Sequence, residues 1–349
     1  MAMKGGVRTI LALDGGGIRG LIPALILQEL QRKLEARGKS EPLHRYFDLI
    51  AGTSTGGIIA AGLAAPDPRA PETPAMTPER LVELYRSDGA RIFARDRFRN
   101  LREAFRELNT EAIFQEKYSA DTLEELLDRH LGESRLRKAL TNVVITAYDI
   151  EARDTVFLRG GPDINALNDK NGVKHDFYFQ AAARATSAAP TYFEPEQVSN
   201  IASGEVHALI DGGVFANQPS LCAFAQARAL GWTPDKIEVL SLGTGYQTRR
   251  FPIGDVKDWG PGQWINPMKG APIISILMHG QADSTNWQMA QILGQRFTRL
   301  DAKLIRGKGN DDMDDASPGN LLALADLARD IIDGHDRQLE DWAERLEPS

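Results

Sequence analysis

The chain has 349 residues, of which 42% are hydrophobic and 26% are charged, and its formal net charge at pH 7 is -7. These values are typical of one large globular domain, alone or with a smaller appendage, and they give no overall attraction to DNA or RNA. The single cysteine, Cys222, excludes an internal disulfide framework, and no stretch is long and apolar enough to span a membrane, so we expect a cytoplasmic protein.

A glycine-rich turn follows the first predicted strand, which spans Thr9 to Leu13. The turn lies in ALDGGGIRG, residues 12–20, and the helical periodicity of residues 21–38 predicts a helix directly after it. Gly15, Gly17 and Gly20 match the G-x-G-x-x-G pattern of a dinucleotide-binding turn. The same N–H groups could instead stabilise an oxyanion.

A second strand, turn and helix follow, with the strand predicted at Tyr46 to Ala51 and the helix at Ile58 to Ala65. Two such units in succession predict a parallel sheet with helices on both faces. The turn between them, GTSTG, has the form of a nucleophile elbow, in which Gly52 and Gly56 leave room for a strained residue at the apex. Ser54 is therefore the candidate nucleophile, and the alternative is a serine that only fills a tight turn.

The segment from Arg86 to Arg106 contains seven arginines interleaved with aromatic and aliphatic residues. Arginine with aromatic residues is typical of contacts with an anionic membrane surface or with phosphate groups. The alternative is a helical hairpin that packs its aromatic residues on the core and exposes a basic face. The arginines that we consider for membrane or anion contact are Arg91, Arg95, Arg99 and Arg102.

The rest of the sequence predicts further strands and helices. Residues 121–131 predict a helix with an apolar stripe, Leu123, Leu126 and Leu127, which His130 extends; we interpret His130 as a residue at the edge of the core. Strands are predicted at residues 142–148, 155–158, 207–210 and 237–242, and helices at residues 273–293 and 321–346. We expect one domain over residues 1–349, with a basic helical insertion around 78–131 and a helical C-terminal region around 270–349.

A serine nucleophile needs a base to take its proton. His279 would complete the order serine, acid, histidine, but it lies in the apolar run PIISILMHG, which predicts a helix interior. Asp211 directly follows the predicted strand 207–210 and precedes two glycines, so we expect it at the carboxyl edge of the sheet, where ligands bind. If burial raises its pKa enough, this carboxylate could accept the proton of Ser54 directly.

The oxyanion interpretation of the first glycine turn is the better of the two. A dinucleotide site also needs an acidic residue at the end of the second strand, whereas here that strand ends in the serine turn. Asp14, beside the glycines, would also repel a pyrophosphate. We therefore predict an oxyanion hole formed by Gly15, Gly16 and Gly17, with Gly16 and Gly17 as the main donors, and Arg19 as a cation that braces the loop or contacts a lipid phosphate.

Together these residues resemble the motifs of the patatin-like phospholipase family. The family's D-G-G-G-x-R-G loop, G-x-S-x-G elbow and D-G-G acid stand here at residues 14–20, 52–56 and 211–213. The resemblance implies a three-layer α/β/α sandwich with a mostly parallel central sheet. It also implies a Ser54–Asp211 dyad that hydrolyses acyl esters of membrane phospholipids through an acyl-enzyme, without a metal or an organic cofactor.

The resemblance also suggests regulation. Some bacterial members of the family are antiphage effectors activated by cyclic oligonucleotides, and this chain resembles them in size. We therefore expect such an activator, a peripheral location at the inner face of the membrane when the enzyme is active, and a homo-oligomer. Two alternatives stay open: a soluble esterase with a Ser-Asp-His triad that uses His279, and a nucleotide-binding regulator that uses the Gly15 to Gly20 loop.

Overall fold

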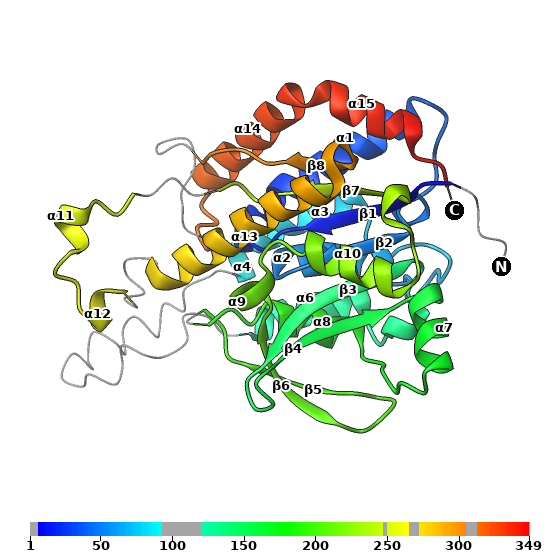
Figure 1. Cartoon of the computed structure of the whole chain (residues 1–349), viewed down its shortest axis with the longest axis horizontal. Helices are drawn as coiled ribbons and strands as arrows, with labels where there is room; N and C mark the ends of the chain where they lie inside the picture. The colour runs from blue at the N-terminus through cyan, green and yellow to red at the C-terminus, as the bar shows by residue number, and fades with distance from the viewer. Residues whose placement is uncertain are drawn as a thin grey trace.

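The computed structural model describes residues 6–92, 120–190, 192–246, 250–264, 272–304 and 313–348. Within these ranges the strands form one mixed sheet in the order β5-β6-β3-β2-β1-β7-β8, with β4 paired to β3 (Figure 1). The parallel strands are β1 (Arg8–Leu13), β2 (Leu49–Gly52), β3 (Asn142–Asp149), β7 (Ile237–Leu242) and β8 (Phe297–Leu300). The antiparallel strands are β4 (Asp154–Gly160), β5 (Glu196–Ser199) and β6 (Val206–Asp211).

Helices cover both faces of this sheet (Figure 1). One face packs against α1 (Leu21–Glu35), α2 (Thr55–Ala64), α3 (Pro78–Glu83), α6 (Asp121–Leu131), α8 (Phe179–Thr186), α14 (Pro318–Gly334) and α15 (Asp336–Arg345). The other face packs against α7 (Pro162–Lys170), α10 (Ser220–Ala229) and α13 (Pro272–Leu293). The predicted three-layer α/β/α sandwich is confirmed.

The central strand β1 shows why the sheet is covered on both sides. Leu11 and Leu13 point into the larger of the two cores, whereas Ile10 and Ala12 point into the core on the opposite face. All four are fully buried and apolar, so beyond Arg8 and Thr9 at its start the strand does not alternate between apolar and polar residues. This pattern is typical of a parallel strand between two layers of helices.

Short helical segments connect these elements. They are α4 (Gly89–Ile92), α9 (Gly213–Ala216), α11 (Ile253–Val256), α12 (Pro261–Trp264), a π-helical turn at Leu84–Asp88, and 3₁₀ turns at Gly17–Gly20, Leu43–Arg45, Leu136–Lys138, Pro234–Lys236 and Gly294–Arg296. Figure 1 shows α11 and α12 standing away from the three layers, at the end of the molecule where α13 begins. No helix in the described ranges is long and apolar enough to cross a membrane.

Several predicted elements differ from the observed ones. The strand expected at residues 46–51 begins only at Leu49, because residues 46–48 form an irregular connection after the 3₁₀ turn Leu43–Arg45. The helix expected at residues 321–346 is two helices, which meet at His335. Of the arginines considered for membrane contact, Arg95, Arg99 and Arg102 lie outside the described residues, and Arg91 in α4 pairs with Asp88 at 3.2 Å.

Candidate active site

Ser54 stands at the apex of the turn between β2 and α2, with φ 56° and ψ −126°. This backbone conformation is strained for a residue with a side chain. The flanking glycines leave the room that the turn needs: a Cβ added at Gly52 would lie 2.1 Å from the Gly56 carbonyl oxygen, and one added at Gly56 would lie 2.2 Å from the Leu13 carbonyl oxygen. The Ser54 N–H donates to Thr186 Oγ1 at 2.8 Å, which holds the apex against α8.

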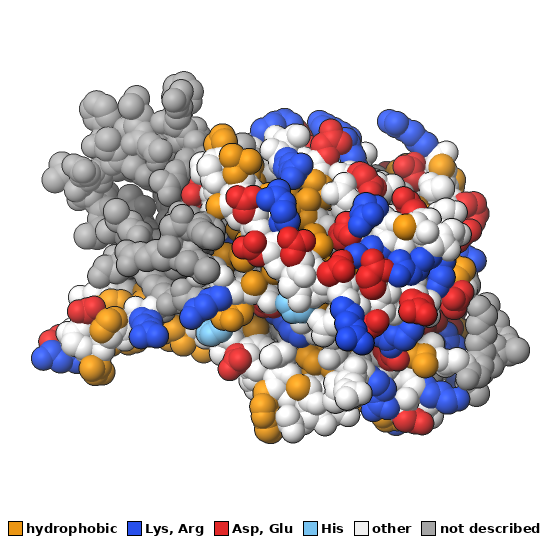
Figure 2. Space-filling model, turned by 90° about the horizontal axis from the view of Figure 1, so that it is seen from above, with side chains coloured by type: hydrophobic (Ala, Val, Ile, Leu, Met, Phe, Trp, Pro, Cys, Tyr) orange, Lys and Arg blue, Asp and Glu red, His pale blue; other side chains and the backbone are white. Residues whose placement is uncertain are grey.

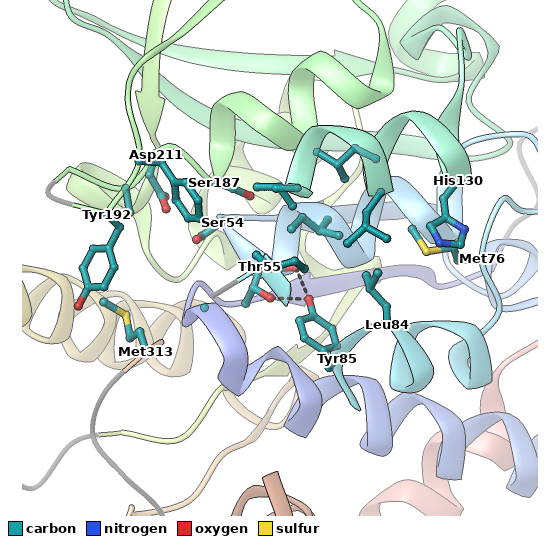
Figure 3. A pocket seen from close by; sticks show the side chains of 18 of the residues that line it. Ser54, Thr55, Met76, Leu84, Tyr85, His130, Ser187, Tyr192, Asp211 and Met313 are labelled. Atoms are coloured by element: carbon teal, nitrogen blue, oxygen red, sulfur yellow. Dashed lines mark hydrogen bonds between the residues drawn. The ribbon is translucent and has the colours of Figure 1, made fainter. Parts of the chain in front are cut away.

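The pairing of β3 explains how Asp211 reaches Ser54. The whole length of β4 pairs with one edge of β3, so β2 and β6 must share the other edge. They approach from opposite directions: Gly52, the last residue of β2, pairs with Ile145, and Asp211, the last residue of β6, pairs with Ala147. The two strands therefore end nearly head to head, and Asp211 and Ser54 lie side by side (Figure 3).

The sequence predicted Asp211 at the carboxyl edge of the sheet but did not predict the direction of the strand before it. That strand, β6, runs antiparallel to β3. Asp211 still reaches the carboxyl edge of the parallel strands, because β6 overlaps only the last three residues of β3, Ala147 to Asp149.

Burial dominates the electrostatics of Asp211. The residue is 2% exposed, its Oδ1 accepts a hydrogen bond from the Gly213 N–H at 2.7 Å, and its Oδ2 has no hydrogen-bond partner among the described residues. Desolvation raises the pKa of Asp211 from 3.8 to about 7, although the Gly213 N–H and the neighbouring Ser54 hydroxyl oppose this rise. A carboxyl group with this pKa can take up and release a proton near neutral pH.

The glycine turn after β1 lies beside Ser54, and its three glycines differ in their hydrogen bonds. The Gly15 N–H donates to the Asn217 carbonyl at 3.0 Å, so Gly15 is not available as an oxyanion donor in this conformation. The N–H groups of Gly16 and Gly17 are bonded to no other described residue, and Gly17 lines the cavity next to Ser54. The predicted oxyanion hole is therefore reduced from three donors to Gly16 and Gly17.

Two arginines hold this loop in place. Arg19 is buried, with Nε donating to the Gly16 carbonyl at 3.2 Å and Nη1 donating to the Gly245 carbonyl at 3.4 Å. Of the two roles expected for Arg19, the structure shows the brace of the loop. Arg299 in β8 binds both carboxylate oxygens of Asp14, at 2.9 and 2.5 Å. Arg299 was not predicted as a site residue, because nothing in the local sequence links it to a loop 285 positions away.

An apolar cavity extends from Ser54 and Asp211 between α2 and α6 (Figure 3). Its walls include Ile58, Met76, Leu84, Leu123, Leu126 and Leu127. The leucine stripe predicted on residues 121–131 thus forms one wall. Figure 3 shows His130 at the opposite end of the cavity from Ser54. His279 does not line the cavity and is exposed on α13, so this conformation gives no support to a triad that uses it.

Comparison with known proteins identifies the family. The model of the family described as patatin-like phospholipase matches residues 11–221. The chain belongs to this family. Patatin-like protein 2 from Arabidopsis thaliana is 32% identical, and patatin-like protein 1 from Oryza sativa subsp. indica is 36% identical; each alignment covers 93% of this chain and 81% of the relative.

Membership of the patatin-like phospholipase family supports lipid acyl hydrolase activity. One relative, from Solanum tuberosum, is named probable inactive patatin-3-Kuras 1; it is 28% identical, and the alignment covers 95% of this chain and 88% of that relative. Family membership alone therefore does not decide whether a given chain is active. For this chain, the evidence that bears on activity is the geometry of Ser54, Asp211 and the glycine loop.

Tyr85 is a site residue that the sequence did not indicate. It lies in the π-helical turn between α3 and α4, is buried, and contacts the Thr55 hydroxyl while donating to the Thr55 carbonyl at 3.2 Å. A Cβ added at Gly20 would lie 2.6 Å from its ring. Tyr85 therefore packs between the start of α2 and the end of the glycine turn. Its only sequence signal was an aromatic residue beside the basic segment.

The raised pKa of Asp211 predicts a pH profile for this patatin-like site. Only the ionised carboxylate can accept the Ser54 proton, so kcat/KM on a water-soluble ester should rise about tenfold per pH unit below pH about 7 and level off above it. The same profile in His279→Ala would show that the titrating group is not that histidine. A rate that is constant between about pH 5 and 8 would contradict the prediction.

Proposed function

We propose that this protein hydrolyses fatty-acyl esters of membrane phospholipids, with Ser54 as nucleophile and Asp211 as general base. The observation that carries the proposal is a buried carboxylate, with one oxygen lacking a hydrogen-bond partner among the described residues, beside a strained serine. Both lie at one end of an apolar cavity that suits an acyl chain. Burial also raises the pKa of Asp211 to about 7, which suits a base that works near neutral pH.

The reaction has two acyl-transfer steps. Ser54 Oγ attacks the ester carbonyl carbon while Asp211 takes the hydroxyl proton, and the N–H groups of Gly16 and Gly17 bind the oxyanion of the tetrahedral intermediate. The intermediate collapses, the carbon–oxygen bond to the alcohol breaks, and Asp211 returns the proton to the leaving oxygen. Water then attacks the acyl-enzyme, again losing a proton to Asp211, and the fatty acid leaves as that proton returns to Ser54.

Fatty-acid release from mixed phospholipid vesicles tests this proposal. We expect release by the wild type and by His279→Ala, and none above background by Ser54→Ala or Asp211→Asn. If His279→Ala is as inactive as Ser54→Ala, the site is a triad and the assignment of Asp211 is wrong. If a fluorophosphonate probe does not label Ser54, the nucleotide-binding alternative for the glycine turn is favoured. Faster hydrolysis of monomeric short-chain esters than of vesicles would indicate a soluble esterase.

Regulation stays a prediction from the family resemblance. An unrestrained lipase inside the cell would digest its host's membrane. The enzyme is therefore expected to be inactive until a cyclic oligonucleotide activator, with a role in antiphage defence, switches it on. A panel of cyclic oligonucleotides added to the vesicle assay should increase fatty-acid release and change the oligomeric state. Full basal activity, with neither property altered by the panel, would contradict this prediction.

A further inference from the structure

Exposed apolar side chains lie beside Met278 of α13, which lines the cavity that contains Ser54. Tyr192 and Met313, labelled in Figure 3, line it as well. The residue before Met278, Leu277, is 60% exposed, and Val214 of α9, which packs on α13, is 41% exposed. Single exposed apolar residues are ordinary, but a group of them that continues the lining of a cavity indicates a binding surface.

This surface continues onto the segment that stands away from the body of the protein. The start of α13 contacts α12, where Trp264 packs on Trp259 with ring centroids 5.1 Å apart, and Trp259 packs on Phe251 at 5.8 Å. Ile253 of α11 is 78% exposed, the largest exposed fraction among the described large hydrophobic residues. Tryptophan side chains favour the boundary between water and lipid, because the ring is apolar and its N–H is polar. We name the surface formed by Val214, Leu277 and residues 250–264 the mouth surface.

The mouth surface carries little net charge. Residues 272–282 of α13 contain no Lys, Arg, Asp or Glu, and the charges of residues 250–264 balance, with Arg250 and Lys257 against Asp255 and Asp258. Over the face of the molecule seen in Figure 2, acidic and basic side chains are intermixed, and hydrophobic side chains are visible at the projecting end. The exposed apolar side chains are thus accompanied by balanced charges, among them the exposed Lys257 and Asp258. A surface without net charge is suited to a zwitterionic lipid layer, whereas an anionic layer would favour a basic one.

We infer that the mouth surface inserts into a zwitterionic phospholipid layer and so delivers the acyl chain to the cavity. The role of this surface rests on the proposed function, because it would bring lipid to Ser54. The membrane binding itself needs no catalysis. This inference differs from the expectation that the basic segment, residues 86–106, contacts the membrane. Insertion driven by apolar side chains responds weakly to salt, whereas arginine contacts with anionic lipid weaken steeply as salt is raised.

Co-sedimentation with phosphatidylcholine vesicles tests the inference in the Ser54→Ala background, where no lipid is consumed. Leu277→Glu and Ile253→Glu should each lower the vesicle affinity about tenfold or more, because each places a charge where an apolar side chain would enter lipid. Trp287→Glu is the matched control. Trp287 is 66% exposed on the same helix, about 15 Å further along, and this variant should bind as the parent does.

The outcomes separate the inference from the proposed function. In the active background, Leu277→Glu should hydrolyse a water-soluble short-chain ester like the wild type, which also shows that it folds, while its vesicle hydrolysis falls. Unchanged vesicle affinity in Leu277→Glu and Ile253→Glu would overturn the inference. Binding that requires anionic lipid and is lost at high salt would also overturn it, in favour of the basic segment. A wild type that binds vesicles but hydrolyses neither ester would contradict the proposed function and leave the docking result intact.

Discussion

Asp211→Asn is expected to abolish fatty-acid release and, at the same time, to make the folded protein more stable above pH 7. An asparagine keeps the shape of the side chain and can still accept the Gly213 N–H, but it cannot take up the Ser54 proton. Removal of a base that acts with a serine nucleophile costs roughly 10⁴-fold or more in rate. The activity of this variant should therefore be close to that of Ser54→Ala.

The expected gain in stability follows from the sign of the pKa change. Because the pKa of Asp211 is about 7 in the folded protein and 3.8 as a model value, the folded state keeps a proton that the unfolded state loses between these pH values. Ionisation of Asp211 therefore lowers the stability of the wild type as the pH rises from about 4 to about 7, and this one group contributes about 4 kcal/mol to the decrease. Asp211→Asn avoids this loss, so its advantage should be largest above pH 7 and should vanish toward pH 4.

Urea denaturation of the wild type and Asp211→Asn at pH 8 and at pH 5 measures this difference. Asp149 in β3 offers a control, because its pKa is shifted in the opposite direction. Its carboxylate accepts hydrogen bonds from the Glu151 and Ala152 N–H groups and pairs with His207, and these contacts lower its pKa. Asp149→Asn should therefore be less stable than the wild type at pH 8. An Asp211→Asn variant that is also less stable at pH 8 would show that the carboxylate is not desolvated as the structure indicates.

Ser54→Ala and Ser54→Gly should both be inactive but should differ in stability. Alanine retains the strain of a side chain at φ 56°, whereas glycine adopts positive φ without it. We expect Ser54→Gly to be more stable than Ser54→Ala by about 1 to 3 kcal/mol, as judged by the free energy of unfolding in urea. The nucleophile is lost in both variants, so their difference in the free energy of unfolding measures the backbone strain of the turn alone.

Ser284 provides the matched pair of control variants. It is exposed in the middle of α13, where the backbone is helical, so Ser284→Ala should be more stable than Ser284→Gly by up to about 1 kcal/mol. The order of the two substitutions is thus opposite at the two positions. If alanine were the more stable replacement at Ser54 as well, the strained elbow would not exist in solution.

Features encoded within a few neighbouring residues could be predicted from the sequence. The elbow at Ser54 is one of them, because an apolar strand, two glycines and a helix in succession leave few backbone paths. The apolar strand β1, with its glycine turn, is another. The strands β5 and β8 were missed because each has only four residues and no clear alternation of apolar and polar side chains. Such short strands are defined by the neighbours with which they pair.

Tertiary structure decided the chemistry around the serine. Asp211 lies beside Ser54 because β2 and β6 end head to head on one edge of β3, and its pKa is raised because packing removes it from water. The Gly15 N–H donates to the carbonyl of Asn217, more than two hundred positions away in the chain, which leaves Gly16 and Gly17 as the candidate oxyanion donors. His279 lies in the predicted helix, but only the packing of α13 turns it toward solvent. Such contacts join segments that are distant in the chain, so no local pattern of residues specifies them.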